Sequence, residues 1–180
     1  MPEQVESEIK LRMEGPDSAR QAVASLGATC ARPRHLEDNR MYDEADRGLY
    51  ATGRALRVRR AEGRAILTYK GPKAAREDGV KSRQEIELDV TDGDGFEAIL
   101  VALGYARVFR YEKYRETYHW RDVEIVVDET PIGTYVEIEG PVATIHEAAR
   151  ALGRGPGDYI GNSYAALFAA AGGVGDMVFP

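Results

Sequence analysis

The sequence predicts an α+β fold in which antiparallel strands close into a barrel with a polar, charged interior and helices packed outside. Charged and apolar residues alternate with a period of two in several segments, beginning with residues 6–12, and this is the period of a β-strand. Segments with an apolar stripe at helical spacing lie among these strands. The connections between strands are mostly short, which favours antiparallel pairing and closure at about eight strands.

The expected elements follow from this periodicity and from turn residues. Strands are predicted at about 3–13, 29–43, 55–60, 65–70, 83–89, 106–119, 123–128 and 135–139. Helices are predicted at 19–26, from the cap at 91–92 to Gly104, at 142–152 and at 159–171. We expect loops at 44–53 and 71–81, one domain over residues 1–172, and a loose tail at 173–180.

Composition narrows the class of protein. The formal net charge of −6 argues against a general nucleic-acid binder, and without a run of about 18 apolar residues no membrane span is expected. Cys30 is the only cysteine of the chain, which excludes an internal disulfide and fits a reducing compartment. We expect Cys30 to be buried and, since no signal peptide is visible, the protein to be cytoplasmic.

The charged strand faces are expected to point into the barrel. Apolar helix stripes must pack on the apolar strand faces, which leaves the charged faces turned away from the helices. In an open sheet these faces would simply be solvated, but in a closed barrel they line the interior. The acids on these faces are Glu6, Glu8, Glu85, Glu87, Glu137 and Glu139, and the bases are Lys10, Arg57, Arg59, Lys70, Arg83, Lys113 and Arg115.

Such an interior indicates a binding site. Burying ions costs several kcal/mol each unless they are paired, hydrated or bound to a ligand. Carboxylates two residues apart on a strand are about 6.6 Å apart at the backbone, near enough to approach one hard cation. Clustered arginine and lysine suit phosphate oxygens. Together these groups predict Mg²⁺ or Mn²⁺ bound with a polyphosphate.

The residues also resemble a known family. Glu6-x-Glu8-x-Lys10 is similar to the signature of the CYTH superfamily, the triphosphate tunnel metalloenzymes, which include class IV adenylate cyclases, thiamine triphosphatases and inorganic triphosphatases. The order of the later motifs supports the resemblance, which covers about residues 3–170. These motifs are Arg57-x-Arg59, Lys70 before Gly71-Pro72, Arg83-x-Glu85-x-Glu87, Lys113-x-Arg115, Asp128 and Glu137-x-Glu139.

The resemblance implies a closed eight-stranded tunnel and a role for each group. The metal ligands would be Glu6, Glu8, Asp128, Glu137 and Glu139. The triphosphate would contact Lys10, Arg57, Arg59, Lys70, Arg83, Lys113 and Arg115. The catalytic candidates are Lys10, Glu85, Glu87 and Tyr42, although core packing is the stronger interpretation of Tyr42. Asp128, Glu85 and Glu87 are also candidates to hold a second ion or a water molecule.

Three functions remain open at this stage. Water attacks a terminal phosphorus in a triphosphatase, whereas in an adenylate cyclase the ribose 3′-oxygen of ATP attacks the α-phosphorus. A non-catalytic triphosphate-binding protein is the third. Some triphosphatases of the family carry a lysine on a C-terminal helix, but here no lysine follows Lys113. The expected partner is ATP, thiamine triphosphate or inorganic triphosphate, with no nucleic acid or membrane, and exposed strand edges or helices are compatible with a homodimer.

Overall fold

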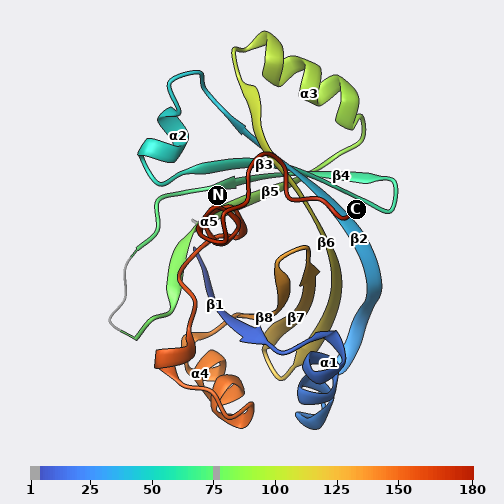
Figure 1. The fold of residues 1–180 in the computed structure, drawn as a ribbon, viewed down its shortest axis with the longest axis vertical. Coiled ribbons are helices and arrows are strands. Elements are labelled where there is room, and N and C mark those ends of the chain that lie inside the picture. The colour runs from blue at the N-terminus through green and yellow to red at the C-terminus, as the bar shows by residue number, and fades with distance from the viewer. Residues whose placement is uncertain (1–4, 75–77) are drawn as a thin grey trace.

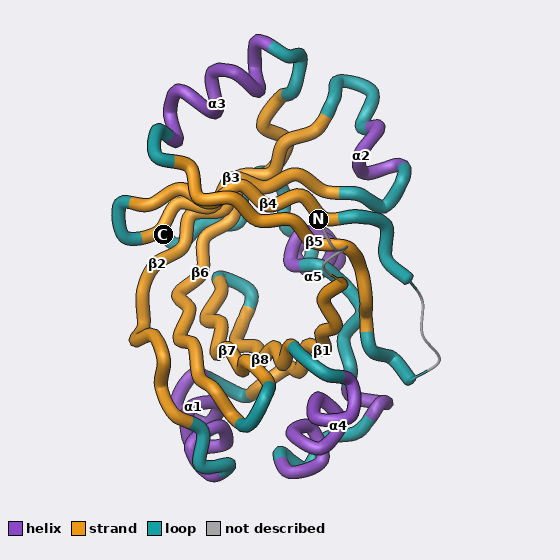
Figure 2. Tube along the Cα trace, turned by 180° about the vertical axis from the view of Figure 1, so that it is seen from behind, coloured by secondary structure: helices purple, strands orange, loops and turns teal. Residues whose placement is uncertain are grey.

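Eight antiparallel strands form a closed barrel in the order β1-β5-β4-β3-β2-β6-β7-β8. The computed structural model describes residues 5–74 and 78–180, and the tube trace in Figure 2 follows the strands around the ring. The strands are β1 (Val5–Met13), β2 (Thr29–Asp43), β3 (Ala55–Ala61), β4 (Arg64–Lys70), β5 (Lys81–Val90), β6 (Ala106–Trp120), β7 (Val123–Thr130) and β8 (Gly133–Glu139). The predicted closed barrel is therefore confirmed. Residues 3–4 of the predicted first strand and 75–77 of the predicted loop lie outside the described residues.

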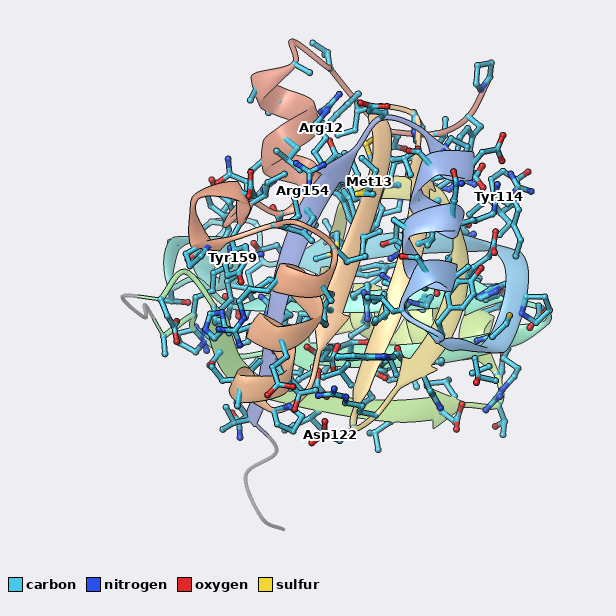
Figure 3. The ribbon with its side chains drawn as sticks, turned by 90° about the horizontal axis from the view of Figure 1, so that it is seen from below. Arg12, Met13, Tyr114, Asp122, Arg154 and Tyr159 are labelled. Atoms are coloured by element: carbon cyan, nitrogen blue, oxygen red, sulfur yellow. The ribbon has the colours of Figure 1, made fainter. Side chains whose placement is uncertain are left out.

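The helices lie on the outside of this barrel (Figure 1). They are α1 (Pro16–Ser25), α2 (Gly48–Ala51), α3 (Gly93–Ala102), α4 (Val142–Ala151) and α5 (Tyr164–Ala170), with a short 3₁₀ turn at Pro156–Asp158. Figure 3 shows α1 and α4 side by side across the strands. Among the described residues, no helix has the length and apolar character needed to cross a membrane.

The apolar core lies between the outer strand faces and these helices. Ile9 and Leu11 of β1 are buried against Val23 of α1 and Ile145 of α4. A second cluster joins Val58 of β3 to Leu100 of α3. Since successive strand residues point to opposite faces, burying the apolar residues outside turns their charged neighbours inward.

Three local predictions need correction. The expected loop at 44–53 contains α2, and the last helix begins at Tyr164 rather than at 159. The carboxylate of buried Asp43 accepts the backbone N–H groups of Glu44, Leu49 and Tyr50 at 2.8, 3.0 and 3.1 Å, which orders a segment that lacks a helical apolar stripe. Cys30, expected to be buried, is exposed.

The C-terminal tail is docked rather than loose. The Met177 side chain is 1% exposed. Its N–H donates to Arg110 O at 2.9 Å, and its carbonyl accepts from Glu112 N at 2.9 Å. Pairing between β6 and β7 begins only at Tyr114, so backbone groups of β6 before that point lack a β7 partner. The tail satisfies them, because unpaired backbone polar groups are costly when buried.

Candidate active site inside the barrel

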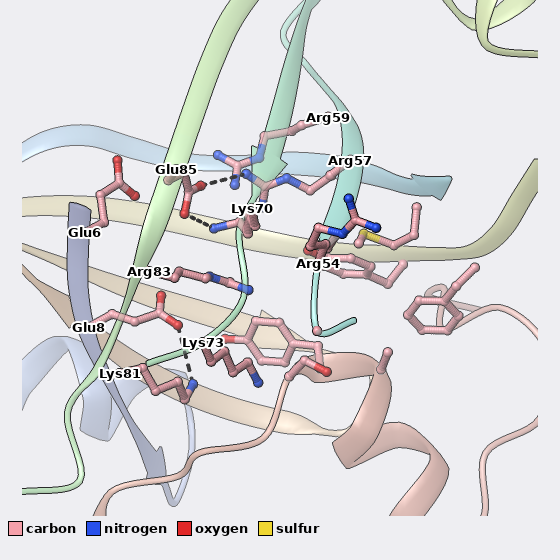
Figure 4. Close-up of a pocket in the computed structure, with 18 of the residues that line it drawn as sticks. Glu6, Glu8, Arg54, Arg57, Arg59, Lys70, Lys73, Lys81, Arg83 and Glu85 are labelled. Atoms are coloured by element: carbon pink, nitrogen blue, oxygen red, sulfur yellow. Dashed lines mark hydrogen bonds and ion pairs between the residues drawn. The ribbon is translucent and has the colours of Figure 1, made fainter. Parts of the chain in front are cut away.

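The predicted charged residues meet in one cavity of ≈ 540 Å³ enclosed by the strands. Figure 4 shows side chains from several strands pointing into it. Its lining includes all seven predicted bases and all six acids of the alternating strands: Lys10, Arg57, Arg59, Lys70, Arg83, Lys113, Arg115, Glu6, Glu8, Glu85, Glu87, Glu137 and Glu139. Asp128, the seventh predicted acid, is fully buried beside it.

Five cations form what we call the cationic centre: Lys10, Arg57, Arg59, Lys113 and Arg115. Two carboxylates hold three of them in place. Asp128 accepts from Lys113 Nζ at 2.8 Å and from two Arg115 nitrogens at 2.7 Å each. Glu137 lies 2.7 Å from Arg115 Nη2 and 3.3 Å from Lys10 Nζ. These ion pairs orient the head groups of Lys10, Lys113 and Arg115 within the cavity, an arrangement suited to presenting cations to phosphate oxygens.

Asp128 and Glu137 therefore lie among cations. The hydroxyl of Tyr164, on α5, also donates to Asp128 at 2.8 Å. Burial alone would raise the pKa of Glu137, but Lys10, Lys113 and Arg115 hold it well below its usual range. Both carboxylates are engaged by neighbouring donors in this arrangement, and their predicted metal-ligand role stays untested.

Five carboxylates gather elsewhere on the inner surface, and we call them the acidic end: Glu6, Glu8, Glu85, Glu124 and Glu139. Glu139 is the strand partner of both Glu8 and Glu124. Burial, followed by repulsion from Glu139 and Glu85, raises the pKa of Glu6 to about 8. Burial and repulsion from Glu8 and Glu85 raise the pKa of Glu139 to about 7. Such crowding opposes ionisation unless a cation neutralises the group.

The donor set at the acidic end fits a hard divalent cation, because carboxylate oxygens are the ligands that Mg²⁺ and Mn²⁺ prefer. Among the described residues, no three potential ligands already converge at metal-binding distance. Glu8 instead lies 3.4 Å from Lys81 Nζ. Burial and repulsion from Glu137 would raise the pKa of Glu8, but Lys81, Lys70 and Lys10 lower it. Metal binding would therefore require side-chain rotation away from the lysines.

Glu85 and Glu87 of β5 face β4 and β3. Glu85 pairs with Lys70, and Glu87 lies 3.2 Å from Arg57 Nη2. The Thr68 hydroxyl donates to Glu87 at 2.7 Å. Burial would raise the pKa of Glu87, but this hydrogen bond and Arg57 lower it, so its carboxylate is an acceptor at the edge of the cationic centre.

Sequence reasoning missed three polar residues on the inner face of β2, namely His35, Glu37 and Asn39. Glu37 is 1% exposed, 3.2 Å from Arg59 Nη1 and 3.5 Å from Lys113 Nζ. Among the described residues, four buried side-chain atoms lack a hydrogen-bond partner, and all lie on the inner faces of β2 and β3: His35 Nε2, Glu37 Oε2, Asn39 Nδ2 and Arg57 Nε. The alternation of these polar residues at 35, 37 and 39 was a usable signal in the sequence.

Tyr42 lines the cavity, but its contacts are those of a packed residue, and its catalytic role stays a prediction. Its ring is buried with Val58 and Leu100 between the barrel and α3, and its hydroxyl donates to Glu97 of α3 at 2.8 Å. Met41 and Asn39 occupy the alternate positions of β2, so strand geometry points the Tyr42 hydroxyl away from the cations. Packing, the stronger interpretation from sequence, explains the residue.

Helix α5 carries no lysine, but the basic side chain of Lys73 lies near the start of this helix. Lys73, in the segment after β4, lines the cavity and its Nζ donates to Gly161 O at 3.4 Å. Burial lowers the pKa of Lys73. Lys10 Nζ donates to Asn162 O at 3.0 Å. Backbone just before α5 therefore contacts two lysines of the cavity.

The fold and cavity together define a tunnel protein with a densely charged interior. The family model of the CYTH domain matches residues 4–157 of the chain. The chain therefore belongs to the CYTH family. It is 30% identical over 149 residues to a "putative adenylate cyclase" of Methanocaldococcus jannaschii, covering 82% of this chain and 83% of that protein.

Solved structures share the fold. A "putative adenylate cyclase" of Vibrio parahaemolyticus superposes with a TM-score of 0.81 at 20% identity, over 92% of this chain and 98% of that one. A "putative adenylyl cyclase" of Hippeastrum, described as having a dominant triphosphatase activity, superposes with a TM-score of 0.70 at 21% identity, over 94% and 97%. At these identities the likeness shows the fold alone.

Proposed function

We propose that the protein is a metal-dependent triphosphatase. The cationic centre carries this proposal, because five cations gathered inside a barrel supply donors for the oxygens of a triphosphate chain, and the acidic end supplies ligands for a divalent cation. The dominant triphosphatase activity described for the Hippeastrum protein of the same fold supports it. An apolar-ligand carrier would instead have an apolar interior.

The chain's own residues divide the work as follows. The cationic centre binds the phosphate oxygens, and Lys70 and Arg83 lie beside it. Its members are Lys10, Arg57, Arg59, Lys113 and Arg115. A divalent cation, Mg²⁺ or Mn²⁺, would neutralise charge on the phosphates. Its ligands would be Glu6, Glu8 and Glu139, with Asp128 and Glu137 as further candidates. Glu85 and Glu87 accept hydrogen bonds from the attacking water and so orient it.

In the reaction, the water oxygen forms a bond to the terminal phosphorus and the bond from that phosphorus to the bridging oxygen breaks. The products are orthophosphate and the shortened diphosphate; at neutral pH one proton of the water stays on the orthophosphate and the other is released to solvent. Arginine and lysine stabilise the charge that builds up on the bridging and equatorial oxygens. No covalent enzyme intermediate is involved, and positioning with electrostatic stabilisation provides the catalysis.

Adenylate cyclase activity is the second candidate, and the name of the Methanocaldococcus relative supports it. In that reaction the ribose 3′-oxygen attacks the α-phosphorus and pyrophosphate leaves. The same tunnel serves both reactions, which differ in the phosphorus that faces the nucleophile.

Product analysis tests the proposal. The protein is incubated with Mg²⁺ or Mn²⁺ and with ATP, tripolyphosphate or thiamine triphosphate, and products are separated by ion-exchange chromatography. Orthophosphate release supports the proposal, while cyclic AMP with pyrophosphate and no orthophosphate contradicts it in favour of the cyclase. Binding without any product identifies the non-catalytic protein.

Arg57→Ala connects the activity to the cationic centre. We expect this variant to weaken triphosphate binding by about ten-fold or more, because charge-assisted hydrogen bonds to a buried site are the strong ones. Arg64→Ala is the control, since Arg64 is exposed and pairs with Asp89 on the surface. Unchanged affinity of Arg57→Ala by calorimetry would contradict the tunnel assignment.

A further inference from the structure

The side chain of Tyr164 enters the cavity from a helix rather than from a strand. Tyr164 is the first residue of α5, and it lines the cavity and is 6% exposed. The start of α5 is capped by Ser163, whose hydroxyl oxygen accepts from Ala166 N at 3.3 Å. The helix start therefore has a defined place from which the Tyr164 ring projects toward the charged residues.

The ring of Tyr164 lies against two lysines of the cationic centre. The ammonium nitrogen of Lys10 is 4.1 Å from the ring centroid, and that of Lys113 is 5.4 Å from it. Both distances fall within the roughly 6 Å over which a cation is attracted to the face of an aromatic ring, an attraction that is stronger where water is excluded. Lys10 and Lys113 are 3% and 2% exposed, so the ring contacts desolvated cations.

The hydroxyl of the same side chain reaches a carboxylate of the cavity. It donates to Asp128 Oδ2 at 2.8 Å, and this oxygen also accepts from Lys113 and Arg115. Tyr164 thus contacts two cations through its ring and, through its hydroxyl, the counter-ion of one of them. A single side chain of α5 therefore touches three charged groups that come from β1, β6 and β7.

Other aromatic rings hold the Tyr164 ring in place. The Tyr135 ring of β8 meets it edge to face, with centroids 5.4 Å apart, and the Tyr111 ring of β6 lies 6.1 Å from it. Farther along α5, the Phe168 ring lies 6.1 Å from that of Phe109 on β6. These contacts dock α5 on the barrel, so the position of the Tyr164 ring is set by the packing of the helix.

A ring face holds a lysine differently from a carboxylate. Lysine has a flexible stem and a compact charge, so its ammonium group needs contacts that restrict it. Glu137, 3.3 Å from Lys10 Nζ, provides such a contact but also offsets the positive charge. The aromatic face attracts the ammonium group without carrying a full negative charge. The lysine is therefore restricted and keeps its attraction for phosphate oxygens.

We propose that Tyr164 is a positioning residue of the cationic centre. Its ring holds the ammonium groups of Lys10 and Lys113, and its hydroxyl holds Asp128, in the arrangement that grips the triphosphate chain. Tyr164 acts through these residues and not on the reacting phosphorus. The inference rests on the proposed triphosphate function and adds to it a residue that α5 supplies.

Tripolyphosphate binding tests the role of the ring. Calorimetry is carried out with EDTA present so that turnover does not interfere, and the Tm of each variant establishes that it is folded. We expect Tyr164→Leu, which loses both ring and hydroxyl, to weaken binding by about ten-fold or more, because the attraction between desolvated cations and an aromatic face is lost. Tyr164→Phe keeps the ring face and should bind within about three-fold of wild type.

A double-mutant cycle separates positioning from a general effect on folding. In a Lys10→Met background, Tyr164→Leu should weaken binding by less than about three-fold, since the closer of the two cations that the ring holds is gone. A merely structural effect of Tyr164→Leu would give the same loss of affinity in both backgrounds.

The control is Tyr118→Leu. Tyr118 packs against the outer core, and its hydroxyl donates to Glu116 at 2.7 Å, so this variant should lose stability and retain its affinity for tripolyphosphate. Wild-type affinity of Tyr164→Leu, an equal loss in Tyr164→Phe, or additive effects with Lys10→Met would overturn the inference. Hydrolysis is judged separately by product formation, so binding without orthophosphate release would refute the proposed triphosphatase without changing the outcome for Tyr164.

Discussion

Replacing Glu37 by glutamine tests whether this buried carboxylate holds the cationic centre together. Glu37 lies 3.2 Å from Arg59 and 3.5 Å from Lys113 and is almost fully buried. Burial would raise its pKa, but Lys113, Arg59 and Arg115 hold the pKa well below its usual range, so the carboxylate is ionised at neutral pH. It therefore offsets positive charge when no phosphate is bound.

The expected loss of stability follows from these contacts. Breaking a buried ion pair costs about 3–5 kcal/mol when the partner is left alone. In the variant, Lys113 still has its ion pair with Asp128 at 2.8 Å, and the glutamine side chain still offers a carbonyl acceptor. We therefore expect the free energy of unfolding to fall by about 1–3 kcal/mol. For a chain of this length each kcal/mol shifts Tm by about 2–4 °C. The Tm of Glu37→Gln should therefore fall by roughly 2–12 °C.

Ligand should reverse the effect. Removing a negative charge beside the phosphates lowers repulsion, so tripolyphosphate should bind the variant more tightly and raise its Tm more than that of wild type. Differential scanning fluorimetry with and without tripolyphosphate measures both effects. Glu147→Gln is the control, because Glu147 pairs with Arg121 at the surface. An unchanged Tm for Glu37→Gln, or a smaller ligand-induced rise, would refute this reasoning.

Three further predictions concern residues outside the cationic centre. Met177→Ala should lower the free energy of unfolding by about 2–4 kcal/mol in urea, whereas a loose tail would leave it unchanged. Tyr42→Phe should keep turnover within two-fold and lose about 1 kcal/mol of stability with its hydrogen bond to Glu97; a catalytic hydroxyl would cost about 100-fold in rate. The Glu37 carboxylate raises the pKa of His35 in the folded protein, so the stabilisation by charged His35 is full below about pH 6.5 and is lost as pH rises through the folded-state pKa. His35→Asn should accordingly be more destabilising at pH 6 than at pH 9 in urea unfolding, and a difference independent of pH would show that folding does not raise the pKa of His35.

The sequence does not show which residues of β2 point into the barrel and which point out. Both faces of this strand carry polar residues, because Asp38 and Arg40 on the outer face form ion pairs with Arg110 and with Glu97 of α3. Neither of the two alternating sets of side chains on β2 is apolar. In addition, the pairing of β2 with β6 contains register shifts. The pattern alone therefore could not assign Glu37 to the interior or Tyr42 to the exterior.

The sequence by itself determined the closed barrel and the inward direction of most charges. Strands such as β1 alternate strictly, and apolar helix stripes leave only one face on which Ile9 and Leu11 can be buried. Tertiary structure alone decided which ions meet, because contacts such as that of Lys113 with Asp128 depend on strand register and closure. It also decided the docking of Met177, since that contact forms only where β7 leaves the edge of β6 unpaired.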